Sequence, residues 1–161
     1  MTSATIHASA VLTNTRAVLI RGSSGAGKSR LALDLIEAGR GGALRFARLV
    51  GDDRVHVQAA GGRLLVRPAE ALAGLIEVRG LGILRLPYEP SAAVGLVVDL
   101  GACAEHLAER LPDPGEQRAI IEGIELPRLA VADGNGALRA VLALLTSGAA
   151  AFCSPTSPLC D

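Results

Sequence analysis

Residues 22–29 restrict the possible folds of this chain more than any other stretch. They read G-S-S-G-A-G-K-S, which fits the phosphate-binding loop pattern G-x-x-x-x-G-K-[ST] at every fixed position. In such a loop the glycines let successive backbone N–H groups point at phosphates, the lysine reaches the terminal phosphates, and the hydroxyl binds Mg²⁺. The pattern therefore predicts that a nucleotide binds at Gly22, Ser23, Ser24, Gly25, Ala26, Gly27, Lys28 and Ser29.

The residues on either side of the loop fit the same interpretation. Residues 17–20 are an apolar strand candidate, and the helix pattern after the loop places four apolar residues on one buried stripe and ends at Gly39. The stripe consists of Leu31, Ala32, Leu35 and Ile36. A loop between a strand and a helix holds phosphates against the helix N-terminus, where the helix dipole favours negative charge.

Lys28 is the only lysine among the 16 basic residues of the chain, and all the others are arginines. The alternative is a glycine-rich turn that matches the pattern by accident. A compact ammonium at the lysine position of the motif fits a phosphate contact better than it fits a solvated surface residue. The choice of residue therefore favours the phosphate-binding interpretation.

Composition favours one α/β domain. A chain of 161 residues is typical of one domain, with 50% hydrophobic but only 2% aromatic residues. Its core must therefore consist of Leu, Val, Ile and Ala, which suits parallel strands packed by helices. We expect a P-loop nucleotide-binding sheet flanked by helices over residues 1–148, with an attached antiparallel hairpin, and a mobile tail over residues 149–161, which are rich in Ala, Ser and Pro.

Charge and hydropathy argue against several classes of partner. The net charge is zero and no basic stripe is interleaved with aromatic residues, so we expect no nucleic-acid partner. Mean hydropathy is +0.39, but no run of about 18 uncharged apolar residues exists. The N-terminus resembles no secretory signal, so we expect a cytoplasmic protein with no membrane partner. Cys103, Cys153 and Cys160 support neither a disulfide framework nor a zinc site.

A second candidate for the phosphate site follows the loop helix. The apolar run 46–50 ends in Gly51-Asp52-Asp53, and in P-loop enzymes a strand commonly ends in an acidic residue that addresses Mg²⁺ or its water. The alternative is a solvated Asp-Asp turn. Residues 7–13 form a strand candidate that begins at His7, a residue that the pattern alone does not distinguish from a structural histidine.

The remaining chain alternates strand and helix candidates. Residues 55–66 read as a hairpin, residues 68–75 as a short helix with Pro68 in its first turn, and residues 94–100 as a strand. Glu77 and Arg79 lie on a strand end beside two glycines, which fits either backbone approach to a ligand or an exposed strand edge. Helices are expected over residues 102–111 and 137–145, and a strand over 124–131, with Pro127 indicating a sheet edge.

Together these stretches resemble the catalytic domain of HPr kinase/phosphorylase, the bacterial enzyme that phosphorylates a serine of the phosphocarrier protein HPr. The resemblance is carried by the His7 strand, the loop, the run L-V-G-D-D-R-V over residues 49–55, and I-E-V-R-G-L-G-I over residues 76–83, which resembles the family's E-I-R-G-L-G-I signature. A weaker match is Glu109-Arg110-Leu111. The similarity runs from about residue 7 to residue 128, and the chain resembles a short form without the N-terminal domain of longer members.

The resemblance implies a role for each matching residue. ATP and Mg²⁺ would be used, Lys28 would contact the phosphates, and Ser29 and Glu77 would hold Mg²⁺. Asp53 would be the general base for the acceptor serine, with Asp52 as its neighbouring carboxylate. The catalytic set implied by the resemblance is Asp53, His7, Lys28, Arg110, Asp52 and Arg79. The family also implies a homohexamer and HPr as partner.

Three functions remain to be compared. A protein serine kinase acting on HPr is the leading hypothesis, and a small-molecule kinase would instead need an arginine-bearing lid, which the sequence does not show clearly. A nucleotide-sensing protein without transfer would not need the Asp-Asp pair. In place of the family's P-V-R-P-G-R-N-like segment, residues 130–136 read A-V-A-D-G-N-G, without arginine, so we expect kinase activity to exceed phosphorylase activity.

Overall fold

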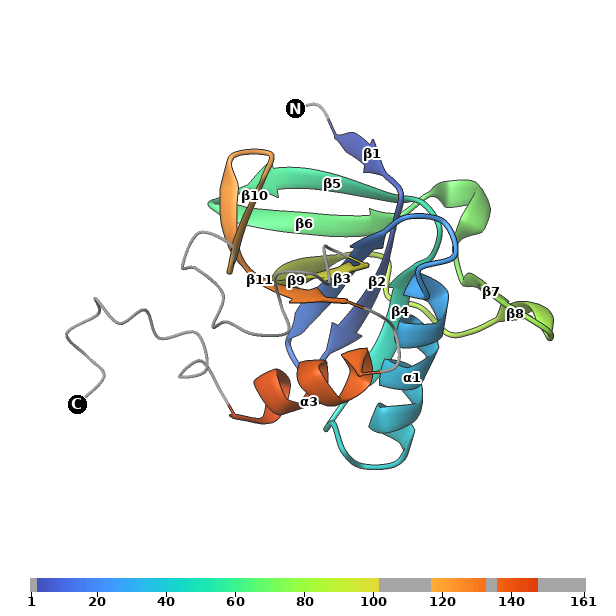
Figure 1. The fold of residues 1–161 in the computed structure, drawn as a ribbon. Helices are drawn as coiled ribbons and strands as arrows, with labels where there is room; N and C mark the ends of the chain where they lie inside the picture. Colours follow the sequence, from blue (N-terminus) through green and yellow to red (C-terminus); the bar gives the residue numbers. More distant parts are fainter. Residues whose placement is uncertain (1–2, 102–116, 133–135, 148–161) are drawn as a thin grey trace.

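The structure is a computed structural model that describes residues 3–101, 117–132 and 136–147 (Figure 1). In chain order its elements are β1 (Ala4–Ile6), β2 (Ala8–Thr13), β3 (Arg16–Gly22), α1 (Lys28–Arg40), β4 (Ala47–Gly51), β5 (Val55–Ala60), β6 (Arg63–Pro68), the 3₁₀ turn η1 (Glu70–Leu72), β7 (Leu75–Val78), β8 (Gly82–Arg85), β9 (Ala92–Leu100), β10 (Arg118–Ile121), β11 (Ile124–Val131) and α3 (Ala137–Ser147).

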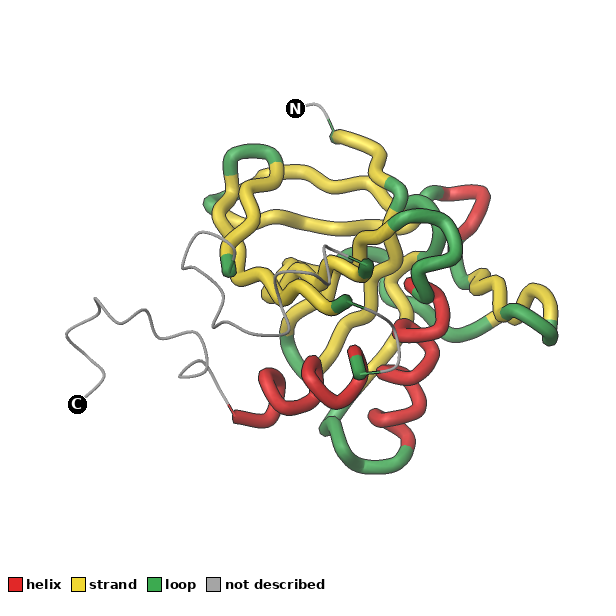
Figure 2. The backbone as a smooth tube through the Cα atoms, viewed as in Figure 1, coloured by secondary structure: helices red, strands yellow, loops and turns green. Residues whose placement is uncertain are grey.

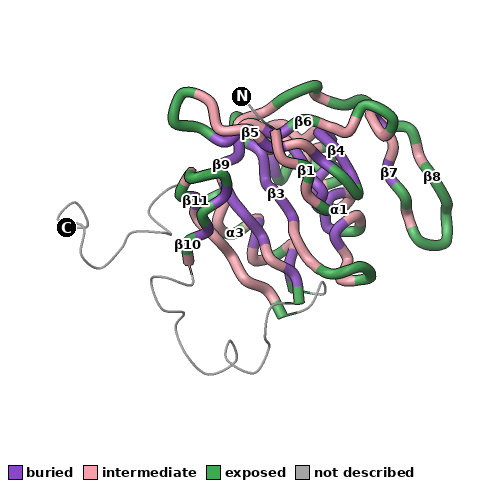
Figure 3. Tube along the Cα trace, turned by 90° about the horizontal axis from the view of Figure 1, so that it is seen from above, coloured by how far each residue is buried: buried purple, intermediate pink, exposed green. Residues whose placement is uncertain are grey.

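Alternating side chains of the central strands build two separate hydrophobic cores. On one face of the sheet, the helix-side core joins Val11, Val18, Ile20, Leu49, Leu96 and Val98 to α1 and α3. On the other face, the hairpin-side core joins Leu19, Val50, Val94 and Val97 to β5, β6, β10 and β11. The two α-helices of the described residues accordingly lie on one side of the strands (Figure 2), and the buried residues gather in the strands between the layers (Figure 3).

Most of the strand pairing is antiparallel. The main sheet has the order β1-β5-β6-β9-β3-β2-β4, with β11 joined to β9 and β10 joined to β11, and β7 and β8 form a separate two-stranded sheet. Only β3 with β9 and β9 with β11 form parallel ladders among the described strands. The α/β fold class predicted from the sequence is confirmed. The face of the sheet opposite the described helices is covered by strands, because β5, β6, β10 and β11 supply the apolar side chains that pack there.

The helix after the phosphate-binding loop has the predicted buried stripe but a different end. Leu31, Ala32, Leu35 and Ile36 are buried as expected. The prediction that the helix ends at Gly39 is wrong, because α1 continues to Arg40 and Gly41 caps it by donating its N–H to the carbonyl of Glu37. Gly39 serves close packing instead, since a β-carbon there would lie 2.6 Å from the β-carbon of Ala47 in β4.

Of four further expectations, one is wrong, one is confirmed and two lie outside the described residues. Pro68 ends β6, and the expected short helix is only η1, because the backbone before Glu70 is extended. Strand 124–131 is confirmed: its first half pairs with β10 and its second half with β9, so among the described strands each half has a partner strand on one side only. The helix expected over 102–111 and the tail 149–161 lie outside the described residues. No described helix is long and apolar enough to cross a membrane.

Candidate phosphate-transfer site

The phosphate-binding loop connects β3 to α1, as the sequence predicted. Gly25 and Gly27 have φ values of +83° and +99°, a left-handed conformation that side chains other than glycine rarely adopt. Lys28 is 7% exposed, and its Nζ donates hydrogen bonds to the carbonyls of Gly22 (2.8 Å) and Ser23 (3.1 Å). The lysine ammonium therefore folds over the loop that it belongs to, where phosphate oxygens would replace the carbonyls as its partners.

Asp52 is the buried carboxylate of the site. It follows β4 directly and is 3% exposed. Its Oδ1 accepts hydrogen bonds from Ser9 Oγ (2.6 Å) and Ser29 Oγ (2.8 Å), and its Oδ2 accepts from Ser29 Oγ (3.0 Å) and from the backbone N–H of Glu77 (3.2 Å). The carboxylate thus joins β2, the start of α1 and β7. The sequence identified Ser29 and Asp52, but it gave no reason to single out Ser9.

Asp53 has different surroundings from Asp52. Its backbone has a φ of +67°, which is unusual for a residue with a side chain. His7 Nε2 lies 3.0 Å from Asp53 Oδ1, and the side chains are 51% and 59% exposed. The two carboxylates that are adjacent in sequence therefore have separate surroundings, one buried against the loop serine and one exposed beside a histidine. An outlier at such a site is a reason to look for function.

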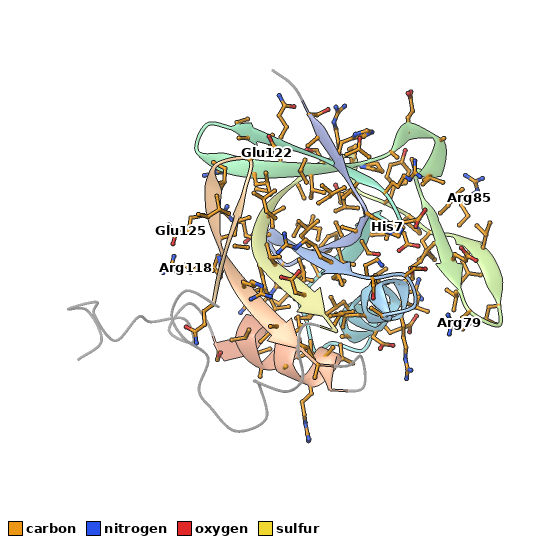
Figure 4. All side chains as sticks on the ribbon, turned by 45° about the horizontal axis from the view of Figure 1, so that its top comes forward. His7, Arg79, Arg85, Arg118, Glu122 and Glu125 are labelled. Carbon is orange, nitrogen blue, oxygen red and sulfur yellow. The ribbon has the colours of Figure 1, made fainter. Side chains whose placement is uncertain are left out.

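Glu77 and Arg79 come from the hairpin formed by β7 and β8, which projects beside the loop (Figure 1). The side chain of Glu77 is exposed, and its backbone N–H is what contacts Asp52. A β-carbon built on Gly25 would lie 3.8 Å from Nη2 of Arg79, so this guanidinium reaches the loop. Figure 4 shows Arg79 on the hairpin, on the same side of the molecule as His7. The hairpin therefore brings a cation to the phosphate-binding loop.

A second cluster, formed by one carboxylate and two arginines, lies at the same end of the sheet. Asp99 of β9 is 13% exposed in its side chain and accepts two hydrogen bonds from Arg21 (2.7 and 2.8 Å) and one from Nε of Arg128 (2.5 Å). Burial raises the pKa of Asp99, but the hydrogen bonds from the two arginines outweigh it and hold that pKa below the ordinary value. Sequence reasoning missed this cluster, which joins β3, β9 and β11.

The residues present fit a magnesium ion. In the described part of the chain no three His, Cys, Asp or Glu side chains form a metal-binding group. Mg²⁺ does not require one, because it usually takes one or two protein oxygens and completes its shell with water and substrate phosphates. Ser29 Oγ and the Asp52 carboxylate lie within hydrogen-bond distance of each other at the start of the phosphate loop helix, and both are hard oxygen donors.

The structure brings most of the residues named from the sequence to one end of the sheet. These are the loop residues, Asp52, Asp53, His7, Glu77 and Arg79. Arg110 lies outside the described residues, as do residues 133–135 of the stretch 130–136 that stands in place of the family's arginine-containing segment. The roles assigned to these residues remain predictions.

Comparisons with known proteins agree on one family. The model of the HPr serine kinase C-terminal domain matches residues 1–144. An HPr kinase/phosphorylase of Streptococcus thermophilus is 39% identical over 123 residues, covering 71% of this chain and 37% of that protein. One from Limosilactobacillus reuteri is 34% identical over 134 residues, covering 78% and 39%. The chain thus spans less than two fifths of the length of these curated relatives.

A solved structure shows the same fold. The structure described as the Hpr(Ser) kinase/phosphatase from Coxiella burnetii aligns with a TM-score of 0.73 at 24% identity, covering 89% of this chain and 95% of that chain. At this identity the likeness concerns the fold alone. It agrees with the strand and helix arrangement described above.

Proposed function

The chain belongs to the HPr serine kinase C-terminal domain family, and from that premise we propose that it is a Mg²⁺-dependent, ATP-using kinase that phosphorylates a serine of the phosphocarrier protein HPr. The observation that carries the proposal is the placement of two adjacent carboxylates. Asp52 contacts the loop serine, Ser29, while Asp53 faces outward beside His7. A transferring phosphoryl group needs both a site for its metal and a base for its acceptor.

The nucleotide would be held by the loop. Backbone N–H groups at the start of α1 face the phosphates, and Lys28 exchanges its two carbonyl contacts for phosphate oxygens. Arg79 approaches Gly25 from the neighbouring hairpin and would add positive charge near the terminal phosphate. Arg110, to which the family resemblance gives a catalytic role, would stabilise charge on the transferring phosphoryl group. Phosphoryl transfer depends mainly on positioning and charge stabilisation, which these residues would supply.

Asp53 would act on the acceptor serine. Its exposed carboxylate takes the hydroxyl proton while the serine oxygen bonds to the γ-phosphorus and the bond from that phosphorus to the β–γ bridging oxygen breaks, releasing ADP. His7 lies 3.0 Å from Asp53 and would orient the carboxylate. Dephosphorylation is a different reaction, in which inorganic phosphate attacks the phosphorus of phosphoserine, the bond to the serine oxygen breaks, and pyrophosphate and the free serine hydroxyl form. It would be slower, because residues 130–136 contain no arginine to attract that phosphate.

The metal would be held by Ser29 and Asp52, with Glu77 approaching from β7. When bound, Mg²⁺ neutralises charge that develops on the phosphate oxygens. Asp52 and Ser29 are already in contact, so this chain's own contribution is a prearranged pair of oxygens. We further propose that residues 1–148 form the catalytic unit and that copies of it assemble into a homohexamer working in the cytoplasm.

The test is transfer of label from γ-labelled ATP to HPr in the presence of Mg²⁺. We expect label on a serine of HPr, and Asp53→Asn should abolish it while nucleotide binding survives, since Asn keeps the shape but accepts no proton. Label on a small metabolite instead would favour a small-molecule kinase. Nucleotide binding without transfer to either acceptor would favour a sensor. Pyrophosphate release in excess phosphate at a rate comparable to that of serine phosphorylation would contradict the expected weak dephosphorylation.

A further inference from the structure

Ser9 is a buried hydroxyl that the proposed reaction does not use directly. It lies in β2 between Ala8 and Ala10, which both belong to the hairpin-side core, and it is 0% exposed. Alternation along the strand therefore turns Ser9 toward the opposite face, where α1 packs. A buried hydroxyl is costly unless it is hydrogen-bonded. Its side-chain partner is the Asp52 carboxylate, at 2.6 Å, which is within the usual range for a charge-assisted bond from a hydroxyl to a carboxylate.

The contacts of Asp52 divide unequally between its two oxygens. Oδ1 receives the shorter bonds, from Ser9 (2.6 Å) and Ser29 (2.8 Å). Oδ2 receives the longer ones, from Ser29 (3.0 Å) and the Glu77 N–H (3.2 Å). Ser9 belongs to a central strand, whereas Ser29 must also serve the metal. The contact from Ser9 is therefore the one that can fix the orientation of Asp52 whether or not a ligand is bound.

We propose that Ser9 is a positioning residue for the metal site: it anchors Oδ1 of Asp52 and so leaves Oδ2 and Ser29 Oγ directed at Mg²⁺ or its water ligands. This inference rests on the proposed function, because it assumes that Asp52 and Ser29 serve a magnesium–nucleotide complex. It assigns a role to a residue in a strand that carries no other part of the phosphate site. Residues that orient metal ligands typically change metal affinity by about 10- to 100-fold when they are replaced.

The experiment measures how the affinity for a fluorescent ADP analogue depends on Mg²⁺, so it needs no turnover. Ser9→Ala should raise the Mg²⁺ concentration for half-maximal effect by about 10-fold, with little change in the affinity measured in EDTA. Ser9→Cys separates loss of the hydrogen bond from loss of packing, because a thiol fills the space but is a weak donor. We expect Ser9→Cys to behave like Ser9→Ala.

Thr13→Val is the matched control. Thr13 is a buried hydroxyl at the other end of the same strand, 3% exposed, and it donates to the carbonyl of Arg16 at the start of β3, whereas the loop follows the end of β3. This variant should lose a buried hydrogen bond yet keep the Mg²⁺ dependence of the unchanged chain. A normal Mg²⁺ dependence in Ser9→Ala, recovery by Ser9→Cys, or an equal loss of affinity with and without Mg²⁺ would overturn the inference alone. If the unchanged chain shows no Mg²⁺-dependent nucleotide binding, the proposed function and this inference both fail.

Discussion

The carboxylates of Asp99 and Asp52 lie at the same end of the sheet but have different kinds of hydrogen-bond partners. Asp99 accepts hydrogen bonds from two arginines, so its negative charge is neutralised within the protein. Asp52 is more deeply buried, yet its partners are two hydroxyls and a backbone N–H. Among the described residues no Lys, Arg or His forms an ion pair with Asp52, whereas exposed Asp53 has His7.

The difference is what we expect between a structural carboxylate and a carboxylate that binds a cation, which is the role proposed for Asp52. A buried charge held only by neutral donors is unfavourable for folding, because hydrogen bonds alone do not offset the desolvation of an ion. Arginines at Asp52 would relieve that cost but would compete with a metal ion. At Asp99 the arginines stabilise the junction of β3, β9 and β11 and leave no net negative charge. Whether a carboxylate is paired with cationic side chains therefore distinguishes a structural role from a cation-binding role better than its burial does.

The largest effect is expected from Asp52→Asn. Loss of the carboxylate should raise the Mg²⁺ concentration for half-maximal nucleotide binding by about 100-fold, the upper end of the range for residues around a metal. Folding stability should be unchanged or higher, because a neutral amide replaces a buried charge and the serine hydroxyls can rotate to match it. Metal-dependent nucleotide binding and denaturant unfolding of one preparation test both parts. A large loss of stability would show that Asp52 is a structural residue like Asp99.

Asp99→Asn should show the opposite pattern. Two partly buried guanidiniums would lose their shared counter-ion, and the free energy of unfolding should fall by about 2 kcal/mol, less than for a fully buried pair. The Mg²⁺ dependence of nucleotide binding should be preserved. Glu89→Gln is the control, because Glu89 pairs with Arg48 in a more exposed salt bridge at 3.0 Å, and its loss should cost under about 1 kcal/mol. Equal losses in the two variants would contradict the comparison.

The contribution of Asp99 should also depend on pH. Burial alone would raise its pKa, but the hydrogen bonds from Arg21 and Arg128 lower it below the unfolded value, so the folded state binds the proton more weakly. The stabilisation is therefore present above the unfolded pKa of about 3.9 and disappears as pH falls through the folded value. Unfolding free energies of the unchanged chain and Asp99→Asn should differ at neutral pH and converge in acid. A constant difference would show that Asp99 does not titrate through this pairing.

The sequence predicted those parts of the site that local patterns encode. The phosphate loop, its strand and helix, and the β5–β6 hairpin follow from glycine spacing and from apolar residues at regular intervals. The Asp-Asp run was predicted from its position at the end of an apolar strand after the loop, whereas Glu77 and Arg79 were assigned roles by resemblance. The structure places both stretches beside the loop. Gly39 misled the prediction of the helix end, because a glycine that allows close packing looks the same in sequence as one that ends a helix.

The two clusters around Asp52 and Asp99 depend on which strands become neighbours. Ser9 lies 43 residues from Asp52, and Arg21 lies 78 residues from Asp99. Arg21 and Asp99 are aligned because β3 and β9 pair in parallel, in the register that sets these residues opposite each other. No local pattern specifies that register, so a serine among alanines and an arginine before the loop gave no signal.

The smallest effect on stability is expected at the third carboxylate, Asp53. Its pair with His7 is half exposed on both sides, and exposed ion pairs contribute about 0–1 kcal/mol. His7→Gln should therefore change the free energy of unfolding by less than about 0.5 kcal/mol, well below the effect of Asp99→Asn. Phosphoryl transfer to HPr should nevertheless fall several-fold, because the outward carboxylate loses the group that orients it, while nucleotide affinity stays the same. Denaturant unfolding and single-turnover transfer on the same preparation measure the two quantities. A stability loss as large as that of Asp99→Asn, with transfer unchanged, would place Asp53 with the structural carboxylates and leave the acceptor serine without its proposed base.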